Sequence, residues 1–419
     1  MTPTVPPPAT ADASRAAGRA LRVLVVSQVL GGAGMAAGIT VGALLAQDLF
    51  DSTSLSGLPV ALFTIGAALG AAALGRICQH RGRRVGLALG NGVAAAGSAG
   101  VVAGAAAHRP AVLLAALFVY GAGTSTGLLA RYAGAELAPP GRRGRATGTV
   151  LVAMTLGAVA GPNLVGPTGA LAHAWGIPRL AGPFLLATAA YAAAALVLLG
   201  WLRSLPPPPV EPAAEPAAAG SGKEPASGTE PHGPVRGVSG VVTGATVMVT
   251  AQLAMISVMT MTPVHLTGHG HGTQTAGLVI ALHVGAMLLP SPLSGLLADR
   301  VGGRPVAAAS GLVLLCAGLL AGLAPPASVV LSACALVLLG IGWNLALIGG
   351  TALLTNAAPA ENRATVQGLA DVGMSVAGAT GGMVSGLVVT GSGYPTLAAA
   401  AGILALAVIP AVALRGSPP

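Results

Sequence analysis

Charged and aromatic residues are scarce in this chain of 419 residues. Asp, Glu, Lys and Arg together make up 7% of the sequence, and Phe, Trp and Tyr together make up 3%. A soluble globular domain carries roughly 25% charged residues, so a water-soluble protein of this length could not cover its surface. Disorder over the whole chain is excluded too, because disordered segments combine low hydrophobicity with high net charge. The composition therefore leaves a membrane protein.

Cysteines and enzyme motifs are equally sparse. The three cysteines, Cys78, Cys316 and Cys334, lie in or beside apolar runs at unrelated spacings, which predicts small core residues rather than disulfides or metal ligands. Neither the phosphate-binding motif Gly-x-x-x-x-Gly-Lys-Ser/Thr nor the zinc motif His-Glu-x-x-His occurs. No polar segment is large enough to form a nucleic-acid-binding domain. We therefore expect no enzyme, no cofactor, no metal and no nucleic-acid partner.

Long apolar runs are what the sequence has in abundance. Hydrophobic residues fill 54% of the chain, and the mean hydropathy is +0.80. A helix needs about 20 apolar residues to cross the hydrocarbon layer. The runs predict an all-α polytopic membrane protein with twelve spans, at 22–46, 56–78, 84–107, 110–134, 146–171, 181–203, 238–262, 274–297, 306–324, 327–355, 363–390 and 394–415.

The basic residues predict how these spans are oriented. With both termini in the cytoplasm, 18 of the 20 Lys and Arg residues lie inside, Arg131 among them, and only Arg109 and Arg179 face out. An excess of Lys and Arg in short cytoplasmic loops is the usual topology signal. We expect a multi-pass protein of the plasma membrane with both termini cytoplasmic.

A segment rich in Pro, Glu, Gly and Ser divides the spans into two groups of six. This segment, 204–237, cannot bury a core, which predicts a flexible cytoplasmic linker. Residues 1–21 are expected to form a disordered tail. The N-terminal six-helix bundle is then 22–203, and the C-terminal bundle is 238–415.

Two short motifs repeat between these halves. The stretch Gly75–Arg84 follows the second span, and Gly295–Arg304 follows the eighth span, 220 residues later. Arg145 and Arg363, each followed by Ala-Thr, open the fifth span of their halves. Repeated halves are the architecture of secondary transporters.

On these features the chain resembles the major facilitator superfamily. The loop motif is similar to the family pattern Gly-x-x-x-Asp-Arg-x-Gly-x-Arg, although Gln79 replaces the Asp in the first half. The resemblance implies two pseudo-symmetric six-helix bundles, with these loops gating the cytoplasmic side; the alternative is that their Arg residues only set topology. The motif residues are Gly75, Gln79, Gly82, Arg83, Gly295, Asp299, Arg300, Gly302 and Arg304.

The fifth span resembles that of the family's drug/proton antiporters. Gly157, Gly161 and Pro162 match their Gly-x-x-x-Gly-Pro motif, which implies proton-coupled efflux. Two glycines four residues apart give a flat helix face, and a proline bends the helix. The alternative is a packing kink without substrate contact. One feature departs from the pattern, because Leu117 stands where such exporters usually have Arg.

Two ionisable residues stand out well inside the predicted spans. Asp371 shares a helix face with Gln367 and Ser375, and His283 lies in the middle of the eighth span. A charge at the bilayer centre costs about 2.5–3.5 kcal/mol on insertion scales, so such residues are candidates for function. Asp371 and His283 are therefore candidates for proton coupling. For each, a buried structural hydrogen bond is the alternative.

Neutral polar residues in the spans are candidates for the lining of a substrate cavity. The resemblance implies that most of their spans face that cavity. The interior contains no mid-membrane Arg or Lys in this prediction, which disfavours an anionic substrate. The candidates are Gln28, Tyr120, Asn163, Gln252, Trp343, Asn344 and Gln367. A histidine group in an outward Gly-rich loop predicts a solvated loop rather than a metal site; it comprises His265, His269 and His271.

The sequence thus predicts a monomeric secondary transporter whose partners are the lipid bilayer, a small molecule and protons. We expect efflux of an amphipathic, drug-like compound by alternating access. An importer or facilitator of a neutral metabolite such as a sugar is the first alternative. A non-transporting membrane sensor or scaffold is the second.

Overall fold

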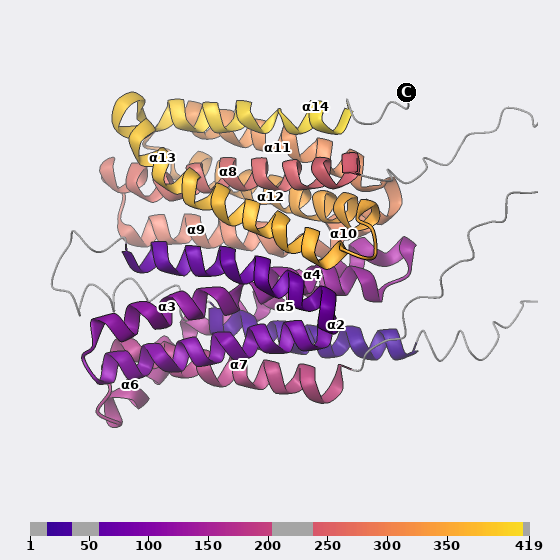
Figure 1. Ribbon diagram of the computed structural model, residues 1–419. Coiled ribbons are helices and arrows are strands. Elements are labelled where there is room, and N and C mark those ends of the chain that lie inside the picture. The colour runs from indigo at the N-terminus through magenta and orange to yellow at the C-terminus, as the bar shows by residue number, and fades with distance from the viewer. Residues whose placement is uncertain (1–14, 36–57, 203–237, 414–419) are drawn as a thin grey trace, which may run out of the picture.

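The computed structural model describes residues 15–35, 58–202 and 238–413, which are helical apart from short connections (Figure 1). The first helix covers residues 15–35. The remaining elements, in chain order, are α2 (Leu58–Ala106), α3 (Pro110–Thr124), α4 (Thr126–Leu137), the 3-10 turn η1 (Pro140–Arg142), α5 (Arg143–Asn163), α6 (Val165–Ala174), the 3-10 turn η2 (Arg179–Ala181), α7 (Gly182–Trp201), α8 (Val238–Gly268), α9 (Thr273–Leu288), α10 (Ser291–Val301), α11 (Gly303–Leu323), α12 (Val329–Ala357), α13 (Arg363–Ala405) and α14 (Val408–Ala413).

Each predicted span has a helical counterpart in the described ranges. Eight helical stretches there are long and apolar enough to cross a membrane, and two of these contain two spans each. In α2 the chain reverses at Gly82 (φ 81°), and in α13 it reverses at Gly393 (φ 82°). A positive φ at both turns favours glycine, which has no Cβ to clash. The helix over 15–35 and the α5–α6 pair supply the remaining spans.

Four spans are broken into two helices, a detail that the apolar runs did not predict. The fourth span breaks between α3 and α4, the fifth between α5 and α6, the eighth between α9 and α10, and the twelfth between α13 and α14. At the first break, Thr124, Ser125 and Thr126 each donate a side-chain hydrogen bond to a backbone carbonyl three residues back. Such bonds offer the backbone an alternative to the regular helix ladder. Pro290 stands at the third break, where it removes a backbone donor.

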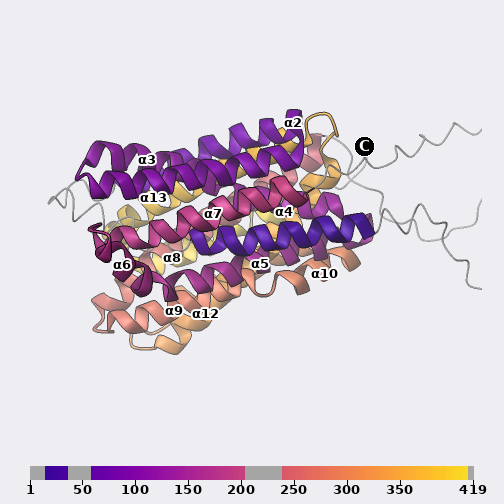
Figure 2. The ribbon, with the colours of Figure 1, turned by 90° about the horizontal axis from the view of Figure 1, so that it is seen from below.

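The helices run side by side along one direction, with the N-terminal half below the C-terminal half in Figure 1; Figure 2 gives the view from below. We call one end of this bundle the linker end, because α7 finishes there at Trp201 and α8 begins there at Val238. The predicted linker itself lies outside the described residues. The tail predicted over 1–21 is helical from residue 15, because a helix continues beyond its apolar core into the polar interface.

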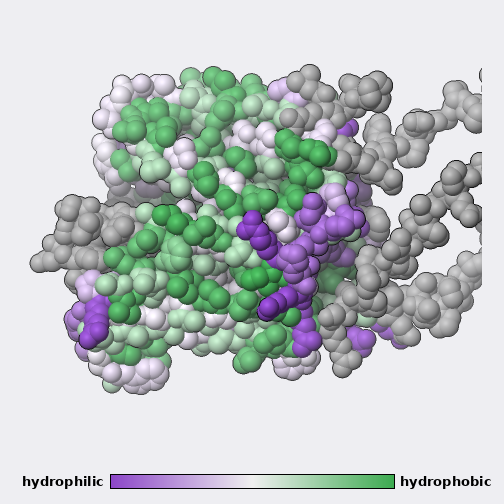
Figure 3. Space-filling view, in the orientation of Figure 1, coloured by the Kyte–Doolittle hydropathy of each residue, from purple (hydrophilic) through white to green (hydrophobic). Residues whose placement is uncertain are grey.

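The outer surface suits a lipid environment. Large apolar side chains face outward, with Leu323 81% exposed and Leu387 75% exposed. Figure 3 shows hydrophobic residues over most of the visible face and a hydrophilic group near the linker end. In water these side chains would be an aggregation hazard, whereas lipid tails solvate them.

Candidate functional site

A buried ion pair joins the two halves near the linker end. Arg131 of α4 donates from Nη2 to Asp371 Oδ1 of α13 at 2.6 Å, and its Nη1 lies 3.4 Å from Oδ2. Arg131 is 0% exposed and Asp371 is 3% exposed. Charge-assisted hydrogen bonds of this forked kind are stronger than neutral ones. The pair therefore holds the halves together wherever both groups are ionised.

Arg131 has more hydrogen-bond partners than Asp371 has. Arg131 also donates to the Leu128 carbonyl at 2.7 Å, to Thr351 Oγ1 at 3.1 Å and to the Tyr132 hydroxyl at 2.9 Å. The side chain of Asp371 has only Arg131 and, at 3.4 Å, the Tyr132 hydroxyl among the described residues. If the carboxyl group were neutralised, the guanidinium would keep these three oxygen acceptors and lose its ionic partner.

The position of Arg131 corrects the sequence prediction. We placed Arg131 among the cytoplasmic topology residues and expected no Arg in the interior. In the structure α4 continues to Leu137, so Arg131 lies within this helix and its side chain is buried. It is the largest fully buried side chain among the described residues. A signal was available, because the predicted span 110–134 already contained this residue. A charge inside a span requires a partner, and Asp371 was the acidic residue in a span.

Arg83 forms a second polar link between the halves. Its guanidinium binds Glu136 on α4 through Nε at 3.0 Å and Nη2 at 2.6 Å, and it donates to the Gln367 side chain on α13. Gln367 in turn donates to Thr355 Oγ1 at 3.3 Å and is 0% exposed. Gln367, which we predicted to line the cavity, therefore lies within the contact between the halves, one helical turn from Asp371.

The repeated loop motif caps a helix of the opposite half in each copy. Asp299 accepts from the backbone N–H groups of Gly144 and Arg145, at the start of α5, at 2.7 and 2.9 Å. Gln79 accepts from the N–H of Ala364, at the start of α13, at 2.8 Å. Free N–H groups at a helix start need such acceptors. The neutral Gln79 keeps the capping role and also donates to the Ala360 carbonyl at 3.1 Å, which an aspartate could not do.

These two caps differ in charge, which leads to a testable difference. We expect Asp299→Ala to lower the melting temperature of the purified protein more than Gln79→Ala, because the aspartate makes two charge-assisted bonds to the helix start. Loss of an N-cap costs about 0.5–2 kcal/mol in soluble proteins. The exposed neighbour Arg300 provides the control, since its side chain makes no hydrogen bond or ion pair with another described residue. Equal decreases in melting temperature for Asp299→Ala and Gln79→Ala would show that the negative charge of Asp299 adds nothing to stability.

Glycines let the two halves approach at backbone distance beside these caps. A Cβ added to Gly75 would lie 2.8 Å from the Ala364 carbonyl oxygen and 2.9 Å from the Gly368 Cα. Gly295 packs equally tightly against the backbone of Gly144. The motif glycines Gly82 and Gly302 instead form turns, with φ of 81° and 87°. Glycine is thus required for close packing at some motif positions and for backbone conformation at others.

A smaller polar contact completes the linker end. Arg143 Nη1 donates to Asn356 Oδ1 at 2.8 Å across the halves. Burial, together with the positive charge of Arg363, lowers the pKa of the Arg143 guanidinium. A hollow of about 220 Å³ beside this contact is lined from both halves, by Thr147 of the N-terminal half and by Asp299 and Thr355 of the C-terminal half among others. Arg304, the last motif residue, is half-buried at the start of α11.

Comparison with known proteins identifies the family. The model of the Major Facilitator Superfamily matches residues 23–372 and 275–419. The chain belongs to this superfamily. It is 46% identical to the uncharacterized MFS-type transporter YddS of Bacillus subtilis, over 94% of this chain and 90% of that protein. It is also 32% identical to the riboflavin transporter RfnT of Brucella anthropi, over 91% of this chain and 92% of that protein.

Solved structures agree on the fold. The human organic anion transporter MFSD10 superposes with a TM-score of 0.73 at 18% identity, covering 94% of this chain and 99% of that one. A bacterial homologue of the iron transporter ferroportin in an outward-facing state gives 0.73 at 13% identity, covering 95% and 99%. The protein is therefore an all-helical, multi-span MFS transporter, a secondary transporter and not an enzyme.

The predicted cavity residues of this MFS transporter fall into different environments. Trp343 Nε1 donates to Gln252 Oε1 at 2.7 Å, which links α12 to α8. Tyr120 is 1% exposed, packs on the rings of Phe63, Phe184 and Tyr191, and donates to a backbone carbonyl at 2.9 Å. Tyr120 thus lies in the core of the N-terminal half.

His283 and Asn344 lie together at the interface of α9 and α12, in the C-terminal half. His283 Nδ1 lies 2.7 Å from the Leu336 carbonyl, and Asn344 Nδ2 donates to the Met287 carbonyl and to Ser291 Oγ, both at 2.7 Å. Both side chains are 0% exposed. These bonds tie α9 and α10 to α12, whereas the other polar atom of each side chain, His283 Nε2 or Asn344 Oδ1, is buried without a hydrogen-bond partner among the described residues.

The remaining candidates give less information. Gln28 is buried in the helix over 15–35. Gly157 packs against the backbone of Val29, while the side chains at 161–163, including Asn163, lie outside the described residues. His265 stacks on Tyr394 with 4.3 Å between ring centroids, away from the linker end. Within the described ranges no group of three or more His, Cys, Asp or Glu side chains could hold a metal ion.

Proposed function

We propose that this MFS transporter exports a small amphipathic compound in exchange for protons, with Asp371 as the proton-carrying residue. One observation carries the proposal, namely the buried Arg131–Asp371 pair between the two halves. A carboxylate held by a single ionic partner in a dry site is a natural place for a proton to compete with that partner.

The proposal assigns the linker end to the cytoplasm. Moving Arg131 from the loops to the interior leaves the excess of basic residues at that end intact, which supports this orientation. The polar links and glycine contacts at the linker end correspond to a state that is closed toward the cytoplasm. Transport then requires these links to break and to form again in every cycle.

A protonation cycle follows from this arrangement. A proton that reaches Asp371 from the outside neutralises the carboxyl group and removes its attraction for Arg131. The linker end then opens, the proton leaves to the cytoplasm, and cargo enters the cavity. With Asp371 ionised again, the ion pair re-forms, and the transporter closes around the cargo and presents it to the outside. Each cycle moves a proton inward and a cargo molecule outward.

The cargo class is inferred from side chains of the C-terminal half. The Gln252–Trp343 pair offers an amide and an indole, and Met255 lies one turn from Gln252. Together they combine apolar contact with a few hydrogen-bonding groups. Apart from Arg131, Asp371 and the ionisable His283, the buried polar side chains of the described spans are neutral. A neutral amphipathic molecule matches this environment.

Riboflavin or a related flat heterocycle is the second candidate cargo. It is favoured by the 32% identity to the riboflavin transporter RfnT, which extends over nearly the full length of both chains. An indole beside an amide is compatible with a flat ring system that has polar edges.

Proteoliposomes test the proposed function. With the purified protein and an imposed pH gradient, we expect amphipathic test compounds to move against the proton flux, and the movement to collapse when a protonophore removes the gradient. Riboflavin belongs in the panel. If riboflavin moves in the same direction as the protons, the conclusion changes from export of this compound to its import. Indifference of every cargo to the pH gradient would refute proton coupling.

A further inference from the structure

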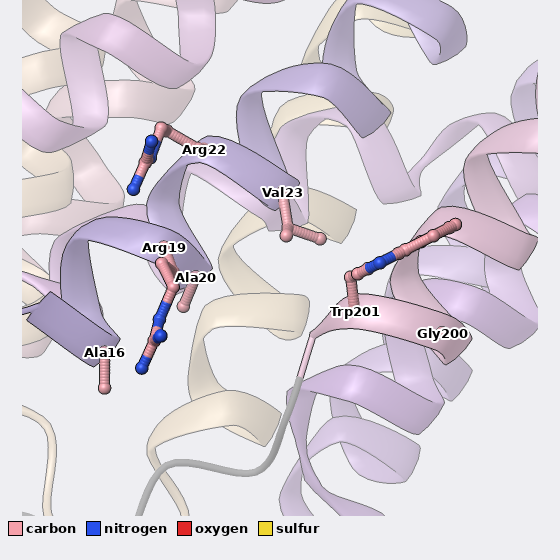
Figure 4. Close-up of a pocket in the computed structure, with 7 residues that line it drawn as sticks. All are labelled: Ala16, Arg19, Ala20, Arg22, Val23, Gly200 and Trp201. Carbon is pink, nitrogen blue, oxygen red and sulfur yellow. The ribbon is translucent and has the colours of Figure 1, made fainter.

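A hollow of about 700 Å³ lies at the linker end, away from the contact between the halves. It separates the first turns of the helix over 15–35 from the last turn of α7 (Figure 4). Figure 4 shows the side chains of Arg19 and Arg22 on one side and that of Trp201 on the other. The other described residues of the lining are small or apolar, namely Ala16, Ala20, Val23 and Gly200.

The positive charges of this hollow are not neutralised. Arg19 and Arg22 are exposed, and neither has a carboxylate partner among the described residues. Among the described residues, no acidic side chain lines the hollow. Elsewhere in the described ranges, Glu136 and Asp371 are bound to arginines. Two free guanidinium groups side by side favour an anionic ligand.

The end of α7 does not oppose such a ligand. The last carbonyls of a helix carry partial negative charge, which would repel an anion. Here Arg84 donates to the Leu199 carbonyl, so a third guanidinium offsets that charge next to Gly200. The electrostatic environment around the hollow is therefore positive on both sides.

The apolar part of the lining sets the chemistry of the ligand further. Trp201 is 68% exposed at the end of a membrane-spanning helix, where tryptophan marks the level of the lipid headgroups. Val23 faces the hollow, and Val26, one turn closer to the bilayer centre on the same helix, is 48% exposed. A ligand here meets positive charge at headgroup level and apolar surface below it.

We propose that this hollow binds an anionic phospholipid from the leaflet at the linker end. Arg19 and Arg22 hold the phosphate, because planar guanidinium groups match phosphate oxygens with two parallel hydrogen bonds. Trp201 packs at the level of the glycerol backbone, and Val23 contacts the first acyl carbons. The site depends on neither the direction of transport nor the proton mechanism.

Lipid titration of the full-length protein tests the site. Purified transporter in detergent is titrated with dioleoylphosphatidylglycerol or with dioleoylphosphatidylcholine, and bound lipid is counted by native mass spectrometry. We expect the wild type to retain phosphatidylglycerol preferentially and Arg19→Gln/Arg22→Gln to bind it about 30-fold more weakly. Arg19→Lys/Arg22→Lys should recover part of the affinity, which separates loss of charge from loss of fold.

A matched control removes two other positive charges from the same end. Arg76 and Arg81 are also exposed there, and Arg76→Gln/Arg81→Gln should leave the high-affinity lipid in place. Equal weakening by both double variants would overturn the site in favour of general surface charge. The lipid site would also be overturned if the wild type retained the two lipids equally, or if inorganic phosphate bound to the wild type as tightly as phosphatidylglycerol does.

The chain itself offers a competing occupant. The segment 204–237 carries Glu211, Glu215, Glu224 and Glu230. If phosphatidylglycerol binds through Arg19 and Arg22 only after these four glutamates are changed to Gln, the hollow belongs to that segment and the lipid proposal fails. Wild-type binding that is unchanged by the four substitutions supports the lipid.

Discussion

Asp371→Asn is expected to abolish pH-gradient-driven transport while leaving cargo exchange at equal pH on both sides. Asparagine has nearly the shape of aspartate but cannot carry the proton or form an ion pair with Arg131. Removing one partner of a buried ion pair costs about 3–5 kcal/mol in soluble proteins, so closure at the linker end should weaken at the same time. The measurement is uphill cargo movement and equilibrium exchange in proteoliposomes, at matched protein content.

Two further variants show what the aspartate does. Ser375 lies one turn along α13 and bonds only to the Asp371 backbone carbonyl among the described residues, so Ser375→Ala should keep coupled transport. The double variant Arg131→Gln/Asp371→Asn restores a neutral, hydrogen-bonding contact. Exchange at equal pH without uphill transport in the double variant, as in Asp371→Asn alone, would agree with a proton-carrying role. Full uphill transport by Asp371→Asn would remove this residue from the mechanism.

The repeat between the halves also relates Arg131 to Thr351, one of its hydrogen-bond partners. Arg131 and Thr351 occupy equivalent positions, 220 residues apart, and they are hydrogen-bonded to each other. Residues related by a pseudo-two-fold axis touch only near that axis. The pseudo-two-fold axis therefore passes close to this hydrogen bond. The N-terminal half places a guanidinium group beside the axis, and the C-terminal half places a hydroxyl group there. The backbone of the two halves is thus related by symmetry at this point, but their side-chain charges differ.

The sequence predicted the elements better than the contacts between them. The lengths of the apolar runs were enough to predict the spans, because a helix in lipid has to satisfy its own backbone. The repeated loop motif was also found in the sequence, and the structure places its Asp299 at the start of α5. The partner of Asp371 was missed because Arg131 lies 240 residues away. Helical periodicity shows which face a residue occupies but not which helix it meets.

The same limit explains the scattered cavity candidates. Tyr120 and Asn344 were chosen because the resemblance implies that their spans line the cavity, and the structure buries both side chains. However, a polar group can avoid lipid inside a half as well as between the halves. Tyr120 does so among aromatic rings and Asn344 against α9. Only a structure distinguishes these environments.

Gly75→Val is expected to hold the linker end open. Its side chain would clash with Ala364 and Gly368 of the other half, where an added Cβ already lies within 3 Å of backbone atoms. Overpacking costs about 1–3 kcal/mol, and a shift of that size changes a two-state population by about 5- to 150-fold. We expect net transport to fall by a comparable factor. Closure of the linker end should also be measurable directly, by labelling the thiol of Thr355→Cys in a chain whose three native cysteines have been replaced by serine.

Thr355 suits this purpose because it is 2% exposed and lines the small hollow shared by both halves. In the Gly75→Val background, a water-soluble maleimide added from the linker side should label Cys at position 355 several-fold faster than in the parent. Gly92→Val is the matched control, because an added Cβ there meets no atom within 4 Å. If Gly75→Val folds, transports and labels like the parent, closure does not pass through this contact. Gly75→Ala, with the smaller side chain, should give a weaker form of the same phenotype, since the clash begins at Cβ.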